Sequence, residues 1–476
     1  MASTLNLASL KTPGVYIDEV ALFPPSVAQV ETAIPAFIGY TERANLRVPG
    51  DLTNVPFRIT SLLEYEQYFG KASKEGASIT VKITESATGT KVIADIDPAT
   101  RSKNFLYYAM QLFFGNGGGA CYIVSVGPQT GTIAFGTATG AGLRRGLEEI
   151  GKIDEPTLLV FPEAIALSDG DLQSLHNDAL AQAALLQDRF VVMDVKIDDM
   201  TSSASTAVTD FRGNQVGINN LKYGAAYTPY LQTVIDFEYD EATVAIDHTV
   251  VGGGAGPFDA VTLSGVTNGA LKSQALLAIA NITNLLPPSA AVVGIYAAVD
   301  SSRGVWKAPA NVSLNYVIGP SHFINDKEQE GINVDVTAGK SVNAIRAFTG
   351  KGTLVWGART LAGNDNEWRY VPVRRFYNMV EESVKKASGQ FVFEPNDANT
   401  WVKVRAMIEN FLTLQWRAGA LAGAKTEQAF FVRVGLGQTM TAQDVLNGIM
   451  IVEIGMAVVR PAEFIVLRFS HKMQES

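Results

Sequence analysis

Histidine is the side chain that most often acts as an acid, a base or a metal ligand near neutral pH. This chain has four, at His176, His248, His322 and His471, and they lie far apart. None has another metal-ligating residue at a useful spacing. The single cysteine, Cys121, excludes an intrachain disulfide and follows a glycine-rich turn, a pattern typical of a small buried residue. We therefore predict no metal site and no catalytic residue.

Glycine-rich stretches can bind phosphates, but those of this chain are incomplete. Residues 252–256 (GGGAG) lack the Lys-Ser or Lys-Thr of a phosphate loop, and residues 348–353 (FTGKGT) have glycine where the Ser or Thr belongs. Residues 115–119 lack the full dinucleotide fingerprint. The carboxylates Glu381 and Glu382 are adjacent on a predicted helix and point in different directions, which does not suit shared acid–base chemistry. We expect no cofactor, and we interpret the chain as a protein without enzymatic activity.

Arginines form the densest polar cluster, in the C-terminal third of the chain. One interpretation is ion pairs within the domain, with solvated ends. The other is a basic wall that faces a negatively charged partner. The cluster comprises Arg359, Arg369, Arg374, Arg375, Arg405 and Arg417, of which Arg374, Arg375, Arg405 and Arg417 are the candidates for the basic wall.

Length and composition indicate a globular protein of several domains. The chain has 476 residues, of which 47% are hydrophobic and 18% charged. A net charge of −9 argues against nucleic acid as a partner, because phosphate binding needs a basic field. From residue 340 onward there are 17 Lys and Arg against 12 Asp and Glu, a net of +5, so the remainder has 21 against 35, or −14. This asymmetry predicts two surfaces with different partners.

The uncharged stretch 273–299 could be mistaken for a membrane span. It contains Asn281, Asn284 and the pair Pro287-Pro288, which would interrupt a helix in the middle of a bilayer. We expect a buried helix, a turn and a second buried element instead, and no direct membrane insertion. The start of the chain lacks a signal-peptide pattern, and we expect a soluble protein.

The middle of the chain has an α/β rhythm. Residues 158–161 and 190–195 read as strands and residues 171–187 as a helix, which is a βαβ unit with parallel strands. Residues 78–97 and about 237–270 read as inserted β hairpins. Apolar residues at helical spacing predict two further helices, at 373–387 and 400–417. The fold class is therefore α/β (mixed α+β), with several domains.

Both ends of the chain contain short strand-like segments. Such segments can pair within one chain, or each can add to the sheet of a neighbouring copy through backbone hydrogen bonds. Exchange between copies is heterologous, and repeated without closure it builds a helical lattice. The residues are Val15, Tyr16 and Ile17 near the start, and Phe464, Ile465, Val466 and Leu467 after Pro461 near the end.

Several segments, taken in order, resemble the C-terminal domain of contractile tail sheath proteins. These are VWGARTL (355–361), EWRYVPVRR (367–375), FEPND (393–397), WRAGALAG (416–423), AFFVRV (429–434) and PAEFIVLRFS (461–470). Near the start, TPGVYIDEV (12–20) and PPSVAQVETAIPAFIGYTE (24–42) resemble the opening arm of the same family. Sheath proteins form the contracting outer cylinder of phage tails, R-type bacteriocins and extracellular contractile injection systems.

The resemblance implies a domain organisation and a role for each chain end. Residues 1–22 would be an N-terminal strand arm, 23–335 an outer and middle α/β region, and 336–476 an inner C-terminal domain that ends in a second strand arm. Residues 15–17 and 464–467 would be the segments exchanged between subunits. The selection of exchange over pairing within the chain comes from the resemblance and not from the segments themselves.

The resemblance also implies partners and a mechanism. Copies of this chain would form hexameric rings stacked helically around an inner tube protein, with baseplate and terminator or cap proteins at the ends. Contraction would release energy stored in the lattice and drive the tube through a target envelope. The finished sheath would belong to a phage tail or a related extracellular or membrane-docked particle. We expect an injection system or a bacteriocin-like particle rather than a large phage, and not a two-component sheath.

Two other functions are weighed against this one. A non-contracting tail tube or scaffold would form tubes of constant length. An oligomeric α/β enzyme would account for the βαβ rhythm and the glycine-rich turns, and would form compact particles instead of cylinders. Electron microscopy of the purified protein would separate the three.

Overall fold

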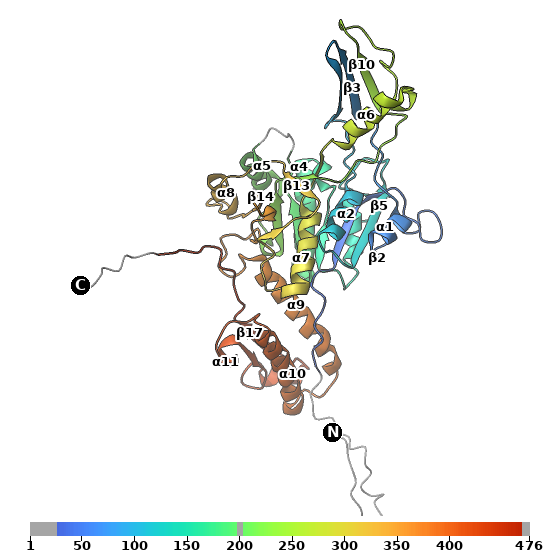
Figure 1. Ribbon diagram of the computed structural model, residues 1–476. Coiled ribbons are helices and arrows are strands. Elements are labelled where there is room, and N and C mark those ends of the chain that lie inside the picture. Colours follow the sequence, from blue (N-terminus) through green and yellow to red (C-terminus); the bar gives the residue numbers. More distant parts are fainter. Residues whose placement is uncertain (1–25, 198–202, 469–476) are drawn as a thin grey trace, which may run out of the picture. The chain divides into compact units, whose positions relative to one another are not determined.

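A nine-stranded sheet is the main element of the fold (Figure 1). The computed structural model describes residues 26–197 and 203–468. They divide into two units: a large unit of Glu31–Met379 with the residues from Arg460 on, and a small unit of residues 26–30 with Val380–Val459. The division falls within helix α9 (Val371–Ser388) and not at residue 336, where we expected the C-terminal domain to begin.

The central strands of the large sheet are parallel, which confirms the predicted βαβ unit. The outer strands β2, β15 and β12 pair antiparallel to their neighbours. In spatial order the strands are β12 (Val312–Ser313), β15 (Gly352–Val355), β14 (Asn343–Phe348), β8 (Gly224–Thr228), β7 (Phe190–Asp194), β6 (Leu158–Val160), β1 (Pro35–Thr41), β5 (Cys121–Pro128) and β2 (Phe57–Ile59).

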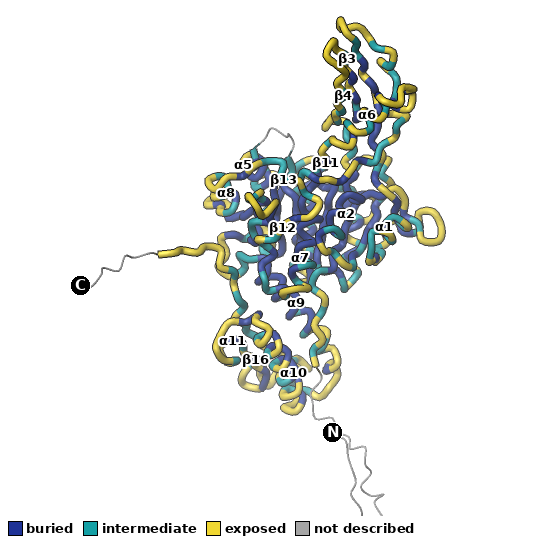
Figure 2. The backbone as a smooth tube through the Cα atoms, viewed as in Figure 1, coloured by how far each residue is buried: buried dark blue, intermediate teal, exposed yellow. Residues whose placement is uncertain are grey.

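Both faces of this sheet are covered, which is why its strands read as continuous apolar runs. In β1, Phe37 belongs to one core cluster and its neighbours Ala36 and Ile38 belong to another. In β7 the alternation is the same, with Val192 on the first side and Val191 on the second. In Figure 2 much of the middle of the large unit is dark blue, the colour that marks buried residues.

Helices from different parts of the chain cover the two faces. Helices α2 and α7 contribute to the first core cluster, and α3, α4 and α5 to the second. The predicted buried elements at 273–299 are helix α6, strand β11 and helix α7. The helices of the large unit are α1 (Leu62–Phe69), α2 (Leu106–Gly115), α3 (Leu143–Ile150), α4 (Asp169–Leu186), α5 (Ala204–Asp210), α6 (Gly269–Ala280), α7 (Ser289–Arg303), α8 (Asp326–Asn333) and the first part of α9.

The two inserted regions form one small sheet with its own core. Strands β3 (Ile79–Ser86) and β4 (Gly89–Ile96) are the predicted antiparallel hairpin. The prediction of a second hairpin at 237–270 is wrong, because that region contributes one strand, β10 (Ala245–Thr249), which pairs parallel with β3. Helix α6 packs on this sheet. Another sheet consists of β11 (Asn284–Leu286), β9 (Leu231–Thr233) and β13 (Val317–Pro320).

The small unit is built around helix α10 (Ala398–Arg417), which was predicted at 400–417. The side chain of its N-cap residue Asp397 accepts a hydrogen bond from the Thr400 backbone N–H. Buried side chains of α10, among them Ile408 and Phe411, pack with β16 (Phe430–Arg433). Strand β16 pairs antiparallel with β17 (Glu453–Met456). Two short helices, α11 (Thr426–Ala429) and α12 (Ala442–Leu446), complete the unit.

Candidate assembly site

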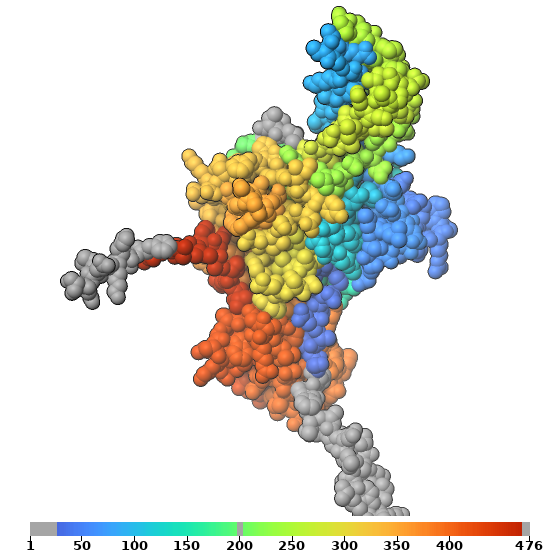
Figure 3. Space-filling model, viewed as in Figure 1, coloured from blue at the N-terminus to red at the C-terminus, as the bar shows by residue number. Residues whose placement is uncertain are grey.

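The C-terminal segment of the described chain is apolar and exposed. Phe464, Ile465, Val466 and Leu467, which we call the C-terminal arm, are exposed by between 72% and 77%. The prediction of a strand here is not met within a protomer, because residues 461–468 form no helix or strand. A strand lying on its own chain would bury one of its two alternating faces, and here the side chains of both alternating sets are exposed. This end of the described chain is yellow, for exposed, in Figure 2 and dark red in Figure 3. The other predicted arm residues, Val15, Tyr16 and Ile17, lie outside the described residues.

Immediately before the arm, the side chain of Glu463 is held by the large unit. Arg359 donates from Nε to both carboxylate oxygens, at 2.9 and 3.1 Å, and from Nη2 to Oε2 at 2.7 Å. Asn333 Nδ2 donates to Oε1 at 2.8 Å, and the Tyr370 hydroxyl donates to Oε2 at 3.1 Å. The Glu463 side chain keeps only 22% of its exposure, although the backbone around it is open to solvent.

The residues that receive Glu463 are positioned by the backbone of the large unit. Arg359 and Tyr370 face each other across an antiparallel bridge. The buried side chain of Asn343 holds the Arg359 backbone on both sides: its Oδ1 accepts from the Arg359 N–H, and its Nδ2 donates to the Arg359 carbonyl. Asn333 is the last residue of α8. The residues that bind the Glu463 carboxylate are therefore also held in place by contacts that do not involve Glu463.

The charges at this site favour the ionised carboxylate. Burial by itself raises the pKa of Glu463, but the hydrogen bonds from Arg359 and Asn333 and the guanidinium charge outweigh it, so the pKa is below its usual range. Burial and the neighbouring carboxylate raise the pKa of the Tyr370 hydroxyl. At neutral pH this is a charge-assisted, bidentate Arg–Glu pair, which is stronger than an exposed ion pair.

A second feature with open backbone groups is the two-stranded sheet of the small unit. Among the described residues this sheet has no third strand, so the outer edge of β16 has no strand partner; beyond the end of β17 the chain continues into an antiparallel bridge between Val458 and Leu421. The ring of Phe431 lies over Gly455, the residue opposite it, where a Cβ would be 2.2 Å from the ring. Two strands alone are marginally stable in water, and unpaired edges are templates for another strand.

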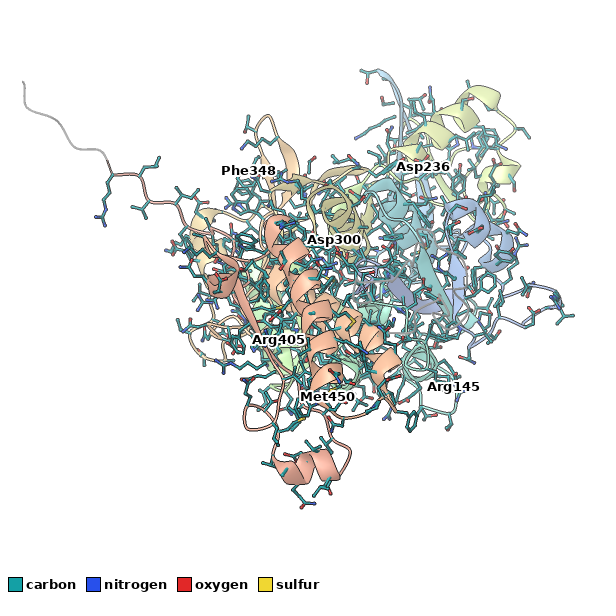
Figure 4. All side chains as sticks on the ribbon, turned by 90° about the horizontal axis from the view of Figure 1, so that it is seen from below. Arg145, Asp236, Asp300, Phe348, Arg405 and Met450 are labelled. Atoms are coloured by element: carbon teal, nitrogen blue, oxygen red, sulfur yellow. The ribbon has the colours of Figure 1, made fainter. Side chains whose placement is uncertain are left out.

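Two of the predicted surface arginines are buried, which corrects their interpretation as a basic wall. Arg374 is 2% exposed, with its guanidinium over the Trp368 ring at 4.3 Å. Arg375 is 3% exposed and pairs with Asp300 of α7 at 2.5 Å (Asp300 is labelled in Figure 4). They belong to the interior, where their charges and aromatic contacts hold the first turn of α9 against the large unit.

The other two candidates are on the surface of the small unit. Arg405, labelled in Figure 4, has a side chain 52% exposed and pairs with Glu409 one helical turn later at 3.1 Å. Arg417 at the end of α10 is also exposed. Their assignment to a tube-facing surface stays a prediction.

Of the titratable residues considered for chemistry, His176, His248 and Cys121 are buried in the protomer. The ring of His176 is buried, which lowers its pKa to about 4, and its Nδ1 lies 2.7 Å from the Gln215 carbonyl. His248 is buried beside Glu85, with 3.3 Å between Nε2 and Oε1. Burial also raises the pKa of the Cys121 thiol, which keeps it protonated and unreactive.

Two buried carboxylates were missed by the sequence reasoning. Burial raises the pKa of Glu163 to about 8, and its oxygens accept hydrogen bonds from the backbone N–H groups of Tyr40 and Leu106. Burial raises the pKa of Asp194 to about 7, and both of its oxygens accept from Ser289 at the start of α7. Glu163 lies three residues after β6 and Asp194 is the last residue of β7, and each connects to the first turn of a covering helix.

The part of the chain that the structure describes contains no helix both long enough and apolar enough to cross a bilayer.

Comparison with protein families matches residues 363–472 to the phage tail sheath C-terminal domain. A tail sheath protein of Vibrio phage KVP40 is 23% identical over 128 residues, 27% of this chain and 19% of that protein. One of Burkholderia phage BcepMu is 29% identical over 150 residues, 30% of this chain and 31% of that protein. The matches thus span between a fifth and a third of the length of these curated relatives.

Solved structures match over nearly the whole chain. The sheath complex of an extracellular contractile injection system, PVC, in its contracted state is 30% identical, covering 97% of this chain and 98% of that chain with a TM-score of 0.64. The contracted helical sheath of the anti-feeding prophage (AFP) is 30% identical, covering 97% and 100% with a TM-score of 0.62. A chain of the contracted AFP baseplate has a TM-score of 0.66 at 25% identity.

Proposed function

This chain belongs to the contractile sheath protein family, and from that premise we propose that it is the structural subunit of a contractile sheath. Copies polymerise as stacked hexameric rings around an inner tube protein, and the polymer shortens to drive the tube through a target envelope. The similarity to sheath chains over almost their full length supports this function. The similarity to a baseplate chain supports a contact with baseplate proteins.

The observation that carries the assembly mechanism is the exposed C-terminal arm. Four consecutive apolar side chains in water lose the free energy that their burial would provide, about 1.5–3 kcal/mol for each fully buried side chain. In a strand, these side chains would alternate between two faces, and both faces would be apolar. We propose that the arm adds as a strand to the outer edge of β16 in another copy, because that edge has no strand partner among the described residues.

Strand addition of this kind supplies both affinity and register. The backbone hydrogen bonds of an added strand are independent of sequence, and the alternating side chains determine which face packs. Because donor and acceptor are different surfaces, the contact is heterologous and propagates without closing on itself. The predicted N-terminal arm, Val15 to Ile17, would add a second connection of the same kind.

The energy for shortening would come from the lattice. We propose that the extended packing formed at assembly is metastable and that the contracted packing is lower in energy, with the arms keeping neighbours connected. We also propose assembly in the bacterial cytoplasm, a terminator or cap protein at the distal end, and a tube-facing surface that includes Arg405 and Arg417. No cofactor takes part in this mechanism.

The direct test removes residues 464–476 and keeps Glu463. We expect folded protomers with an unchanged melting temperature that form no cylinders in electron micrographs at concentrations where the wild-type chain does. Removal of residues 1–22, the predicted N-terminal arm, should have the same result. Normal cylinders from both truncations would overturn the proposal, and wild-type tubes of one constant length would favour a non-contracting tube.

A paired substitution tests strand addition itself. In the variant Phe464→Ser/Val466→Ser one face of the arm becomes polar, and in Ile465→Ser/Leu467→Ser the other face does. A strand added to a sheet packs only one face, so we expect one pair to raise the critical concentration for polymerisation at least tenfold more than the other. Equal effects of the two pairs would contradict strand addition.

A further inference from the structure

Three segments that resemble the sheath family meet at one carboxylate. Arg359 comes from VWGARTL, Tyr370 from EWRYVPVRR and Glu463 from PAEFIVLRFS, and they are joined by Asn333 at the end of α8. We call these four residues the Glu463 clasp. Over 90 residues separate Glu463 from Tyr370 in the chain, so the clasp is a tertiary contact and not a local turn.

In the clasp, both oxygens of the Glu463 carboxylate accept hydrogen bonds. Oε1 accepts from Asn333 and Arg359, and Oε2 accepts from Arg359 and Tyr370. The Arg359 side chain is only 5% exposed, so removal of its carboxylate partner would leave a buried cation without a counter-charge at this site. That penalty makes the closed clasp the favoured state of the protomer.

The position of the clasp in the chain suggests its purpose. Val459 is the last residue of the small unit. The arm begins at Phe464, directly after Glu463. Residues on both sides of Glu463, such as Arg460 and Phe464, are exposed. The Glu463 side chain is therefore what attaches this stretch of chain to the large unit.

We propose that the Glu463 clasp positions the C-terminal arm for capture by a second copy of this chain. With the clasp closed, the arm starts from a fixed point on the large unit, and a second copy meets it at a higher effective concentration and a smaller entropic cost. Force applied to the captured arm passes through Glu463 into the large unit as well as along the chain into the small unit. The inference rests on the proposed function and assigns positioning residues to it.

The test uses the full-length chain with Glu463→Gln, which keeps the shape and removes the charge. Chymotrypsin can cleave the exposed bond after Phe464, but its binding cleft needs several residues on each side in extended form, so Glu463 must leave the clasp first. In unassembled protomers, we expect this bond to be cleaved about tenfold faster in the Glu463→Gln variant than in the wild-type chain, as measured by mass spectrometry. The rates are normalised to those of synthetic peptides with the same two sequences.

The same variant should raise the critical concentration for polymerisation about tenfold, measured at a temperature where its protomer is still folded. Glu463→Asp, which restores the charge on a shorter side chain, should recover part of both effects. Tyr370→Phe leaves the cleaved sequence intact and should produce a two- to threefold change in the same direction. The control is Glu241→Gln, which removes an ion pair of the same length to Lys272, 2.7 Å, away from the arm, and should change neither quantity.

The outcomes separate this inference from the proposed function. Unchanged cleavage in Glu463→Gln would overturn the clasp, whether or not polymerisation changes, because the arm would then not be held in the protomer. Faster cleavage with unchanged polymerisation would overturn the positioning role. If the wild-type chain forms no cylinders under any condition, the proposed function fails, and the positioning role fails with it.

Discussion

The large unit and the small unit differ in how completely each buries its own apolar residues. The large unit has a nine-stranded sheet whose two faces are covered by helices, with side chains such as Phe37 and Phe190 fully buried. The small unit has a two-stranded sheet and leaves large apolar side chains such as Phe393 and Leu446 in solvent. In the protomer, the first unit is complete and the second is not.

This difference indicates where neighbouring copies add structure. A sheet of nine strands with two covered faces needs no further strand, whereas a pair of strands gains stability from each one added. The open edge of β16 lies within residues 363–472, the part of the chain matched to the sheath C-terminal domain. We therefore expect substitutions in the core of the large unit to act on protomer stability, and those on the C-terminal arm and on the edge of β16 to act on assembly.

The largest effect on stability should come from the core of the large unit. Phe37→Ala removes a ring that packs edge-on against Phe113, with 5.1 Å between centroids, at a site with no exposure. We expect a loss of about 3–5 kcal/mol in the free energy of unfolding, measured by denaturant titration. Leu185→Ala, at a side chain 82% exposed, is the control and should change it by less than about 0.5 kcal/mol. A loss below about 1 kcal/mol for Phe37→Ala would contradict the view that the large unit is complete in the protomer.

The next effect concerns pH and the buried carboxylate of Asp194. Burial raises its pKa to about 7, so the native state keeps a proton that the unfolded state releases at about pH 4. Between these values the native state binds more protons, so the free energy of unfolding falls as the pH rises and becomes level above pH 7. Asp194→Asn resembles the protonated form and should remove this pH dependence. At pH 8 the free energy of unfolding of the variant should exceed that of the wild type by about 3 kcal/mol.

The measurement is the free energy of unfolding from pH 4 to pH 8.5 for both chains. Asp326→Asn is the control, because that side chain is 93% exposed and its ion pair with Arg346 should contribute little. Since Glu163 adds a slope of its own in the same direction, the quantity to compare is the difference between wild type and variant. A difference that does not change with pH would contradict the protonated state of Asp194.

The smallest effect should come from a strained residue of the small unit. Phe393 has φ of 72° and is fully exposed, so its side chain packs against nothing while its backbone adopts the left-handed conformation. Phe393→Gly should stabilise the small unit by up to about 1 kcal/mol, measured by hydrogen exchange of α10. The neighbour Val392, with φ of −65°, is the matched control, and Val392→Gly should destabilise by a similar amount. If both substitutions destabilise, the strain is absent.

Local patterns were sufficient for most elements. The apolar runs at 158–161 and 190–195 predicted parallel strands, because strands covered on both faces must be apolar throughout. The helical spacing of the apolar residues at 400–417 predicted α10 to within two residues of its start. The segments that resemble sheath proteins predicted the family, because a resemblance in residue type and order can be seen in the sequence without knowledge of the fold.

Only the tertiary structure decided how distant segments meet. Strand β10 joins β3 across more than 150 residues, and no periodicity in either segment indicates its partner. Arg374 and Arg375 looked like surface charges, but the ring of Trp368 lies against the Arg374 guanidinium, and Asp300 of α7 pairs with Arg375. Glu463 looked like one polar position on a strand, and Arg359, Tyr370 and Asn333 make it the base of the arm. A sequence encodes local backbone preference at each position, whereas a buried charge depends on partners that are brought together only by the fold.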